Sequence, residues 1–425
     1  MLKAVPAVLL SLCLLALPAA EPLLAQPQGA RQGPTRVAGR AIADDGGPFA
    51  ALGVTLFWAA WAYKHDPGRL DEHLQLLAAH GVDYIRALGV VGRQPYWAGR
   101  EIDSRWPDYD QVIAGLTDHA YDRYGLRVEW TLFGDADQMV PDPADRERLV
   151  DRFLKMSVGR EHKIVHFELA NESWQNGFEG PDGVRQLQAL TRRLASQTSI
   201  PVAISASHGH ECADHQALYK GMDVEIITEH FDRDIRGPLK RWGPVAATWG
   251  IRNCEGLPPV ISNNEPIGPR SSVESETEPY YLLAGAIASY MASVSLYVFH
   301  TDAGVLGREP LIDMPGAPAM LKGFAAMKQY LPADVATWRR HTRDSPEHVF
   351  RSKGGVQLFA SVKENRFFAL AIGLDSPMTI EPRQPVTFDV IDLLTGEVLD
   401  RHTLGAGTTV HLSGRPAVVL SGTLR

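Results

Sequence analysis

The chain has 425 residues, of which 45% are hydrophobic and 22% are charged. This ordinary globular composition excludes wholesale disorder, and the length is sufficient for two or three domains. Acidic residues outnumber basic ones by 50 to 42, which gives a formal net charge of −8. A nucleic-acid partner is therefore not expected, because proteins that grip phosphates concentrate lysine and arginine.

The first 25 residues have the pattern of a secretory signal peptide. A short positive start precedes an apolar run at residues 4–17, which is too short to span a bilayer, and small residues follow it. We expect cleavage near Ala20 or Ala25 and a secreted or periplasmic protein without stable membrane insertion. A membrane anchor that stays attached is the alternative. Residues 26–48 are rich in Gly, Pro, Gln and Arg, which indicates a flexible lead-in.

Eight apolar and β-branched runs in the next part of the chain predict strands. They lie at residues 52–58, 82–88, 126–134, 163–172, 202–208, 224–231, 258–265 and 293–300. Every gap between them has room for a helix, so we predict an α/β fold, a (β/α)₈ TIM barrel over residues 49–337. An open doubly wound sheet is the rival, but the strand count is eight and no glycine-rich phosphate motif follows the first strand.

The helices between these strands have recognisable starts and apolar stripes. Asp66 can cap a helix in which Pro67 is the first residue. Leu70, Leu74 and Leu77 then fall on one face of that helix, which is typical of packing against a barrel.

Beyond residue 338 the apolar pattern changes to short strands separated by turn residues. These strands are expected at residues 349–351, 356–362, 367–372, 386–390, 408–412 and 417–420. They predict a small antiparallel β-sandwich domain over residues 338–425.

Two predicted barrel strands end in glutamates. Glu172 follows the fourth strand and Glu265 ends the seventh. The C-terminal ends of barrel strands face one cleft, so we expect both carboxylates to meet there. Glycosidic bond cleavage needs such a pair, one carboxyl as the acid and the other as nucleophile or base. Each glutamate taken singly is equally compatible with a salt bridge at the barrel rim.

The sequence FELANE at residues 167–172 resembles the Asn-Glu motif on strand four of clan A glycoside hydrolases. The resemblance covers roughly residues 50–335 and implies that Glu172 is the acid/base and Glu265 the nucleophile. It also implies a retaining, two-glutamate double displacement without a cofactor, in a cellulase-like glycosylhydrolase. Asn171 is then expected to hydrogen-bond the sugar 2-hydroxyl.

Three further residues are candidates for supporting roles. Arg86 matches the strand-two arginine that orients the nucleophile in clan A, although it can instead form a buried ion pair with Glu168. His230 matches a strand-six position where the clan often has His or Tyr. The chain departs from the clan pattern at Phe231, where a tyrosine is usual, and at strand eight, which ends at His300 and lacks the usual tryptophan.

Aromatic residues gather in the predicted loops at the same end of the barrel, where a sugar ring can stack on them. We expect substrate contacts from Trp174, Trp58 and Trp61, with packing at the rim as the alternative for each. Other aromatic residues in these loops are Tyr63, Trp97 and Trp106. The predicted partner is therefore a poly- or oligosaccharide, whose sugar and linkage the sequence does not indicate.

Two other function classes compete with this hypothesis. His208 and His210 form a His-x-His pair, and with His215, His166 or His230 they are compatible with a metal-dependent barrel hydrolase. We expect no metal, because ligands on other strands are poorly placed. The second alternative is a non-catalytic carbohydrate-binding barrel.

The cysteines leave one question open. Cys13 lies in the expected signal peptide, so the mature chain keeps Cys212 and Cys254. The two can pair outside the cytoplasm, but their separation in sequence does not decide whether they do. Neither cysteine has the spacing of a zinc site.

Overall fold

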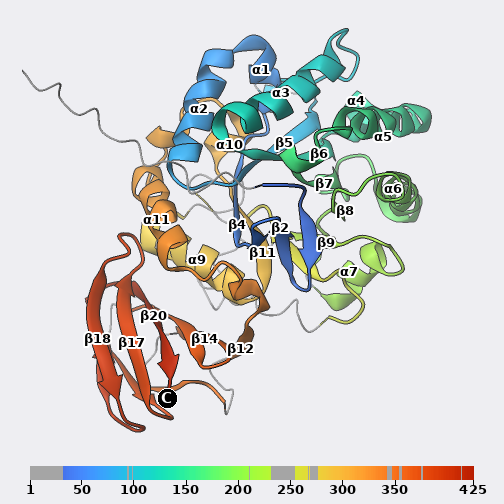
Figure 1. Ribbon diagram of the computed structural model, residues 1–425. Helices are drawn as coiled ribbons and strands as arrows, with labels where there is room; N and C mark the ends of the chain where they lie inside the picture. The colour runs from blue at the N-terminus through green and yellow to red at the C-terminus, as the bar shows by residue number, and fades with distance from the viewer. Residues whose placement is uncertain are drawn as a thin grey trace, which may run out of the picture.

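The structure is a computed structural model that describes residues 32–425 apart from residues 93–94, 98, 210, 231–253, 267, 269–275, 342–346, 354–356, 375–376 and 413. The expected signal peptide and Phe231 lie outside the described residues. A barrel of parallel strands is surrounded by helices, and an antiparallel β domain packs beside α9 and α11 (Figure 1). The predicted fold class is therefore confirmed.

Eight parallel strands close the barrel, with each strand hydrogen-bonded to two neighbours. They are β4 (Ala51–Thr55), β5 (Tyr84–Val90), β6 (Arg127–Phe133), β7 (Ile164–Ala170), β8 (Val202–Ala203), β9 (Ile226–Glu229), β10 (Val260–Asn263) and β11 (Val294–Phe299). All of their residues are buried, because side chains fill the barrel on one face and helices cover the other. This explains the nearly continuous apolar runs in the sequence.

Helices cover the outside of the barrel and connect its strands. The α-helices are α1 (Ala59–His65), α2 (Pro67–Ala79), α3 (Tyr109–Tyr124), α4 (Ala136–Met139), α5 (Pro143–Ser157), α6 (Gly180–Ala195), α7 (Cys212–Tyr219), α9 (Pro279–Met291), α10 (Asp302–Leu306) and α11 (Ala317–Tyr330). Short 3₁₀ turns are η1 (Pro95–Trp97), η2 (Glu161–Lys163), η5 (Leu311–Asp313) and η6 (Val335–Thr337). In α2, the side chain of Asp66 accepts from the backbone N–H of Arg69 at 3.4 Å, which caps the helix as predicted.

The expectation of a flexible lead-in is wrong for residues 36–48. They form a three-stranded sheet of β1 (Arg36–Ala38), β2 (Ala41–Asp44) and β3 (Gly47–Pro48). Every residue of β2 is buried, and Asp44 pairs with the equally buried Arg127 at 3.0 Å. Because Ile42 packs with residues from the beginnings of barrel strands, this sheet closes the N-terminal end of the barrel.

The C-terminal domain consists of two facing antiparallel sheets. The six-stranded sheet contains β12 (Arg339–His341), β14 (Gln357–Lys363), β15 (Arg366–Ile372), β20 (Ala417–Leu424), β17 (Val386–Asp392) and β18 (Val398–Leu404). The three-stranded sheet contains β13 (Phe350–Lys353), β16 (Met378–Pro382) and β19 (Val410–Leu412). Phe350, Phe367 and Phe388 meet between the sheets with ring centroids 5.4–6.2 Å apart, as expected for a sandwich core.

The barrel and the sandwich share one hydrophobic core. Phe368 and Leu370 on β15 belong to the same buried cluster as the barrel helices. The hydroxyl of Tyr280 on α9 donates to Asp392 at 2.7 Å, and that of Tyr330 on α11 donates to the carbonyl of Leu393 at 2.8 Å. The sandwich therefore packs against the side of the barrel, away from the ends of β7 and β10 that carry the two glutamates.

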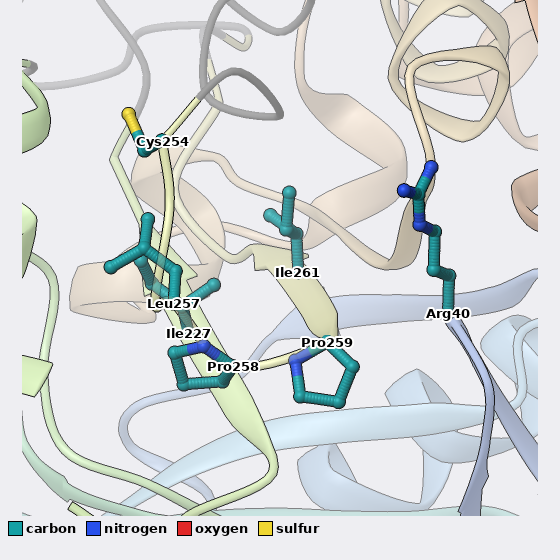
Figure 2. Close-up of a pocket in the computed structure, with 7 residues that line it drawn as sticks. All are labelled: Arg40, Ile227, Cys254, Leu257, Pro258, Pro259 and Ile261. Carbon is teal, nitrogen blue, oxygen red and sulfur yellow. The ribbon is translucent and has the colours of Figure 1, made fainter. Parts of the chain in front are cut away.

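Cys212 and Cys254 form a disulfide, which answers the question that the sequence leaves open. The bond connects the start of α7 to the segment before β10. Beside it lies a hollow of about 180 Å³ (Figure 2). The described residues that line it are Arg40, Ile227, Cys254, Leu257, Pro258, Pro259 and Ile261, and none of these is a carboxylic acid. Among the described residues, no helix is long and apolar enough to cross a membrane.

Candidate active site

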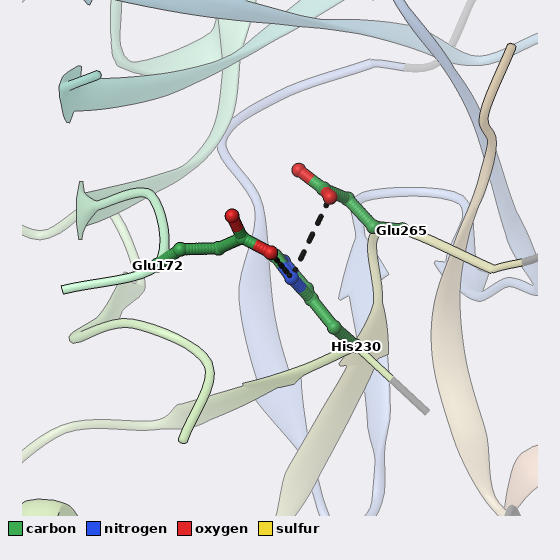
Figure 3. Close-up of side chains that lie close together, drawn as sticks. All are labelled: Glu172, His230 and Glu265. Carbon is green, nitrogen blue, oxygen red and sulfur yellow. Dashed lines mark hydrogen bonds and ion pairs between the residues drawn. The ribbon is translucent and has the colours of Figure 1, made fainter. Parts of the chain in front are cut away.

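Two strand ends bring Glu172 and Glu265 together across the barrel mouth. Glu172 lies two residues after the end of β7, and Glu265 lies two residues after the end of β10. One carboxylate oxygen of each lies, with a ring nitrogen of His230, in a cluster whose atoms are all within 4.8 Å of one another. Figure 3 shows both carboxylates directed toward the imidazole of His230.

The backbone of Glu172 is strained. Its φ is +41°, in the left-handed region that side-chain-bearing residues rarely adopt; among the described non-glycine residues only Ser293 and Glu364 also have positive φ. Such strain persists only where surrounding contacts hold it, and it concentrates at functional sites. The carboxylate is held by His230 Nδ1, 3.1 Å from its Oε1, and by the side-chain amide of Gln175, which donates to its Oε2.

Glu265 is oriented by Arg86, whose guanidinium is completely buried. Arg86 Nη1 donates to Glu265 Oε1 at 2.8 Å, and Nη2 donates to Glu168 Oε2 at 2.7 Å. The two alternatives for Arg86 are thus both realised, because the guanidinium fork serves two carboxylates at once. The Oε1 atom of a third carboxylate, Glu129, lies 3.2 Å from Arg86 Nε.

Three carboxylates stabilise the positive charge of Arg86. Burial alone would lower the pKa of Arg86, but the carboxylates of Glu168, Glu265 and Glu129 outweigh it and raise that pKa above its ordinary value. The guanidinium is therefore a permanent positive charge beside Glu265, which favours the ionised carboxylate there.

Asn171 is held in a defined orientation by the same guanidinium. Its Oδ1 accepts from Arg86 Nη2 at 2.8 Å. Arginine has no acceptor, so the amide oxygen must face it and the amide NH₂ group is directed elsewhere. Asn171 also lines the cleft, so this NH₂ group is available as a donor close to Glu172.

Two histidines flank the second oxygen of Glu265. His230 Nδ1 lies 3.5 Å from Glu265 Oε2, and His300 Nε2 lies 3.9 Å from the same oxygen. The other ring nitrogen of His300 shares a 3.0 Å hydrogen bond with Thr55 Oγ1 at the end of β4. The structure thus brings both predicted histidines to the predicted carboxylate pair.

A cleft of about 390 Å³ opens over these groups. It is lined by Phe57, Leu88, Tyr96, Trp97, Gly134, Asp135, Asp137, Gln138, Asn171, Glu172, Gln175, Asn176, Glu265, His300 and Val305. The aromatic members come from the loops after β4 and β5, and the polar members mostly follow β6 and β7. The cleft therefore combines ring faces with hydrogen-bonding groups around the carboxylate pair.

None of the three tryptophans expected to contact substrate is among the described residues that line this cleft. Trp58 is only 2% exposed and its indole N–H donates to the carbonyl of Ala303, so it is a core residue. Trp61 on α1 packs against the ring of His65 and beneath the guanidinium of Arg100. Trp174 lies close to the pair, with its ring 6.1 Å from that of His230.

Several residues that line the cleft were not among the expected site residues, and Asp135 and Trp97 are two of them. Asp135 lies two residues after the end of β6 and is 8% exposed. The rule that singled out Glu172 and Glu265, a carboxylate just past a buried strand, applies equally to Asp135. Of the tryptophans expected in these loops, Trp97 lines the cleft and Trp106 is not among its described lining residues. No sequence pattern distinguishes the two.

The structure does not assemble the histidine cluster of the metal hypothesis from the residues it describes. His210 lies outside the described residues, and His208 is exposed beside Trp174. His215 is buried against Glu229 at 2.8 Å and Ser207. Glu172, His230 and Glu265 are close enough to share a cation, but the positive charge of Arg86 already occupies the Glu265 side of that group.

Neither protein-family models nor curated proteins gave a match to this sequence. Solved structures do resemble it. A glycoside hydrolase family 5 protein from Bacteroides vulgatus ATCC 8482 superposes with a TM-score of 0.65 at 13% identity, covering 92% of this chain and 94% of its own. A GH30 endoxylanase from Clostridium papyrosolvens C71 gives 0.53 at 10% identity, covering 89% and 97%. The chain has the fold of these glycoside hydrolases. Another similar structure is a conserved exported protein from Bacteroides fragilis, with a TM-score of 0.51 at 10% identity over 87% of this chain and 96% of that one.

Proposed function

We propose that the protein is a secreted, retaining glycoside hydrolase that cleaves O-glycosidic bonds of an oligo- or polysaccharide. The observation that carries this proposal is the approach of Glu172 and Glu265, whose nearest carboxylate oxygens lie within 4.8 Å across a cleft. Retaining enzymes hold their two carboxyl groups roughly 5–5.5 Å apart, whereas inverting enzymes need about 6.5–9.5 Å to admit a water.

In the first step Glu172, protonated, gives its proton to the glycosidic oxygen as the bond from that oxygen to the anomeric carbon breaks. Glu265 forms a bond to the anomeric carbon through a carboxylate oxygen. Arg86 Nη1 donates to its Oε1 at 2.8 Å, and we assign the attack to Oε2, which lies 3.5 Å from His230 Nδ1 and 3.9 Å from His300 Nε2.

In the second step water attacks the anomeric carbon of the glycosyl ester. Glu172, now ionised, takes a proton from this water, and the bond between the sugar and Glu265 breaks. Both carboxyl groups return to their starting states. Two inversions at one carbon leave the configuration of the product the same as that of the substrate.

The neighbouring groups support these roles. Arg86 keeps Glu265 ionised and oriented, and His230 lies within reach of both carboxylates. The NH₂ group of Asn171 is the donor we assign to the sugar 2-hydroxyl, a contact that strengthens as charge develops on the sugar ring.

Secretion is supported by two independent features. The first 25 residues have a signal-peptide pattern. The described part of the chain contains a disulfide, which persists in oxidising compartments outside the cytoplasm.

Replacement of each glutamate tests the assignment. We expect Glu265→Ala to lose at least 1,000-fold in turnover on an aryl glycoside cleaved by the wild type, because no nucleophile remains. Azide should restore turnover by entering the vacated space and should give a glycosyl azide of inverted configuration. Glu172→Ala with azide should instead give a retained glycosyl azide, since Glu265 still forms the ester. A matched control is Glu309→Ala, a carboxylate outside the cleft.

The other function classes make different predictions for the same samples. A non-catalytic barrel would show no turnover on any glycoside of a broad chromogenic panel. A metal-dependent hydrolase would lose activity on exhaustive chelation and regain it with added metal. Full activity of Glu265→Ala without azide would contradict the proposed nucleophile.

A further inference from the structure

Asp135 fixes the position of a neighbouring indole. Its Oδ2 accepts from the backbone N–H of Gly92 at 2.7 Å and from Trp97 Nε1 at 2.8 Å. The side chain is 8% exposed, so these bonds are shielded from competing water. The backbone contact anchors the carboxylate to the end of β5, and the anchored carboxylate in turn holds the indole.

Trp97 is also held from its sides. Its ring makes edge contacts with Tyr96 at 5.1 Å and with Phe57 at 6.5 Å between centroids. All three rings line the cleft that contains Glu172 and Glu265. An indole fixed by one hydrogen bond and two ring contacts loses little further freedom when a ligand stacks on it, which favours binding.

The position of Trp97 relative to the reacting groups follows from Phe57. The Phe57 ring stacks under Arg86 at 4.9 Å, and Arg86 binds Glu265. Trp97 contacts the same Phe57 ring and lines the same cleft as Glu265. A sugar stacked on Trp97 in this cleft is therefore expected next to the ring attacked by Glu265.

The charge of the cleft restricts which sugars fit. Four of its lining residues are carboxylic acids: Asp135, Asp137, Glu172 and Glu265. Among the described residues that line it, none is Lys or Arg. Among these described residues, a sugar carboxylate would meet like charges at close range and no cation, which costs binding free energy.

We propose that Trp97, held by Asp135, is the stacking platform of a subsite for an uncharged pyranose ring adjacent to the site of cleavage. The proposal rests on the proposed glycoside hydrolase function and extends it to substrates of at least two sugar units. Trp97 is assigned as a binding residue, and Asp135 as a positioning residue that acts through it.

Calorimetric binding to the inactive Glu265→Gln protein tests the subsite without turnover. The neutral probes are cellotetraose, xylotetraose and mannotetraose, and the anionic probe is tetragalacturonate. We expect one or more neutral probes to bind and tetragalacturonate to bind at least tenfold more weakly. Trp97→Ala should weaken the neutral probe at least tenfold, and Trp97→Phe, which keeps a ring, should weaken it less.

Asp135 is tested by two variants with different hydrogen-bonding capacity. Asp135→Asn keeps an oxygen acceptor for the indole and should retain most of the affinity, whereas Asp135→Leu removes it and should approach the Trp97→Ala value. Trp106→Ala is the matched control, since Trp106 is a half-buried tryptophan outside the cleft, and its affinity should equal that of the parent. The unfolding temperatures of the variants show which of them remain folded, and Trp97→Phe preserves the test if Trp97→Ala does not fold.

The outcomes separate the subsite from the hydrolase function. Equal affinity of Trp97→Ala and parent, equal binding of the anionic probe, or no binding of any neutral probe would each overturn the subsite. Wild-type protein that cleaves no glycan while its binding still depends on Trp97 would overturn the hydrolase function and leave the subsite standing.

Discussion

At the scale of single residues, Arg86 connects most of the candidate site. It binds Glu265, Glu168 and Asn171 within 2.8 Å, from a position without solvent contact. Removing one partner from such a buried charge network typically costs about 3–5 kcal/mol, because the remaining charges lose their compensation. The same group that orients the nucleophile is therefore also part of what stabilises the barrel interior.

The role assigned to Asn171 predicts a substrate-dependent loss. Asn171→Ala should lower kcat/KM about 100-fold on the cleaved aryl glycoside, equivalent to roughly 2.7 kcal/mol of transition-state stabilisation. The matching 2-deoxy glycoside lacks the hydroxyl, so parent and variant should cleave it at similar rates. A 100-fold loss on both substrates would mean that Asn171 acts only through Arg86.

Residues of the candidate site could be predicted from the sequence where a barrel strand determines their position. Arg86 lies on a buried strand and Glu172 and Glu265 each follow one by two residues, and the barrel geometry brings the three together. Trp58 and Trp61 lie in a loop and a short helix whose directions depend on tertiary packing, so the sequence does not indicate whether either residue lines the cleft. Asp135 followed the same strand-end rule as the glutamates and was missed because it lacks a recognisable motif.

At the scale of elements, β12, β16 and β18 were missing from the predicted sandwich. β18 is largely exposed and contains Asp400, Arg401 and His402, so it shows no apolar alternation. It forms because β17 supplies hydrogen-bond partners along its length. β8 shows the opposite case, since only Val202–Ala203 of the strand predicted at residues 202–208 is strand. Burial makes a segment apolar whether or not it pairs with a neighbouring strand.

The sandwich contains a histidine that should make it sensitive to acid. His348 is 1% exposed, and its Nδ1 accepts from the backbone N–H of Phe350 at 3.1 Å. Burial, with a smaller contribution from His341, lowers the pKa of His348 to about 4. The unfolded chain takes up this proton near pH 6.5, so the folded state is fully favoured above that pH and loses stability as the pH falls towards 4.

Between pH 7 and pH 4.5 this residue should cost about 2–3 kcal/mol of unfolding free energy. His348→Asn keeps an acceptor for the Phe350 N–H but does not titrate, so its loss over the same range should be smaller by that amount. Urea unfolding of both proteins at the two pH values measures the difference. Parallel pH dependence of the two proteins would show that His348 is already charged in the folded state.

At the scale of the whole molecule, the sequence predicted two domains but not how they join. The apolar periodicity of α11 predicts a helix with one buried face. It does not indicate that β15 of the sandwich belongs to the same hydrophobic core. The small sheet of β1–β3 was also unpredicted, because its polar and glycine-rich composition resembles a linker. The residues that this sheet packs against come together only when the barrel closes, so the sequence does not indicate that they are covered.

The proposed mechanism requires a covalent bond between the sugar and Glu265, which mass spectrometry of a trapped intermediate detects. A 2-deoxy-2-fluoro glycoside with a dinitrophenolate leaving group, based on the sugar that the protein cleaves, forms the ester quickly and hydrolyses slowly. We predict that the intact protein gains the mass of one fluoroglycosyl group and that peptide mapping locates it on Glu265. Release of dinitrophenolate without any adduct, or an adduct on another residue, would contradict the account.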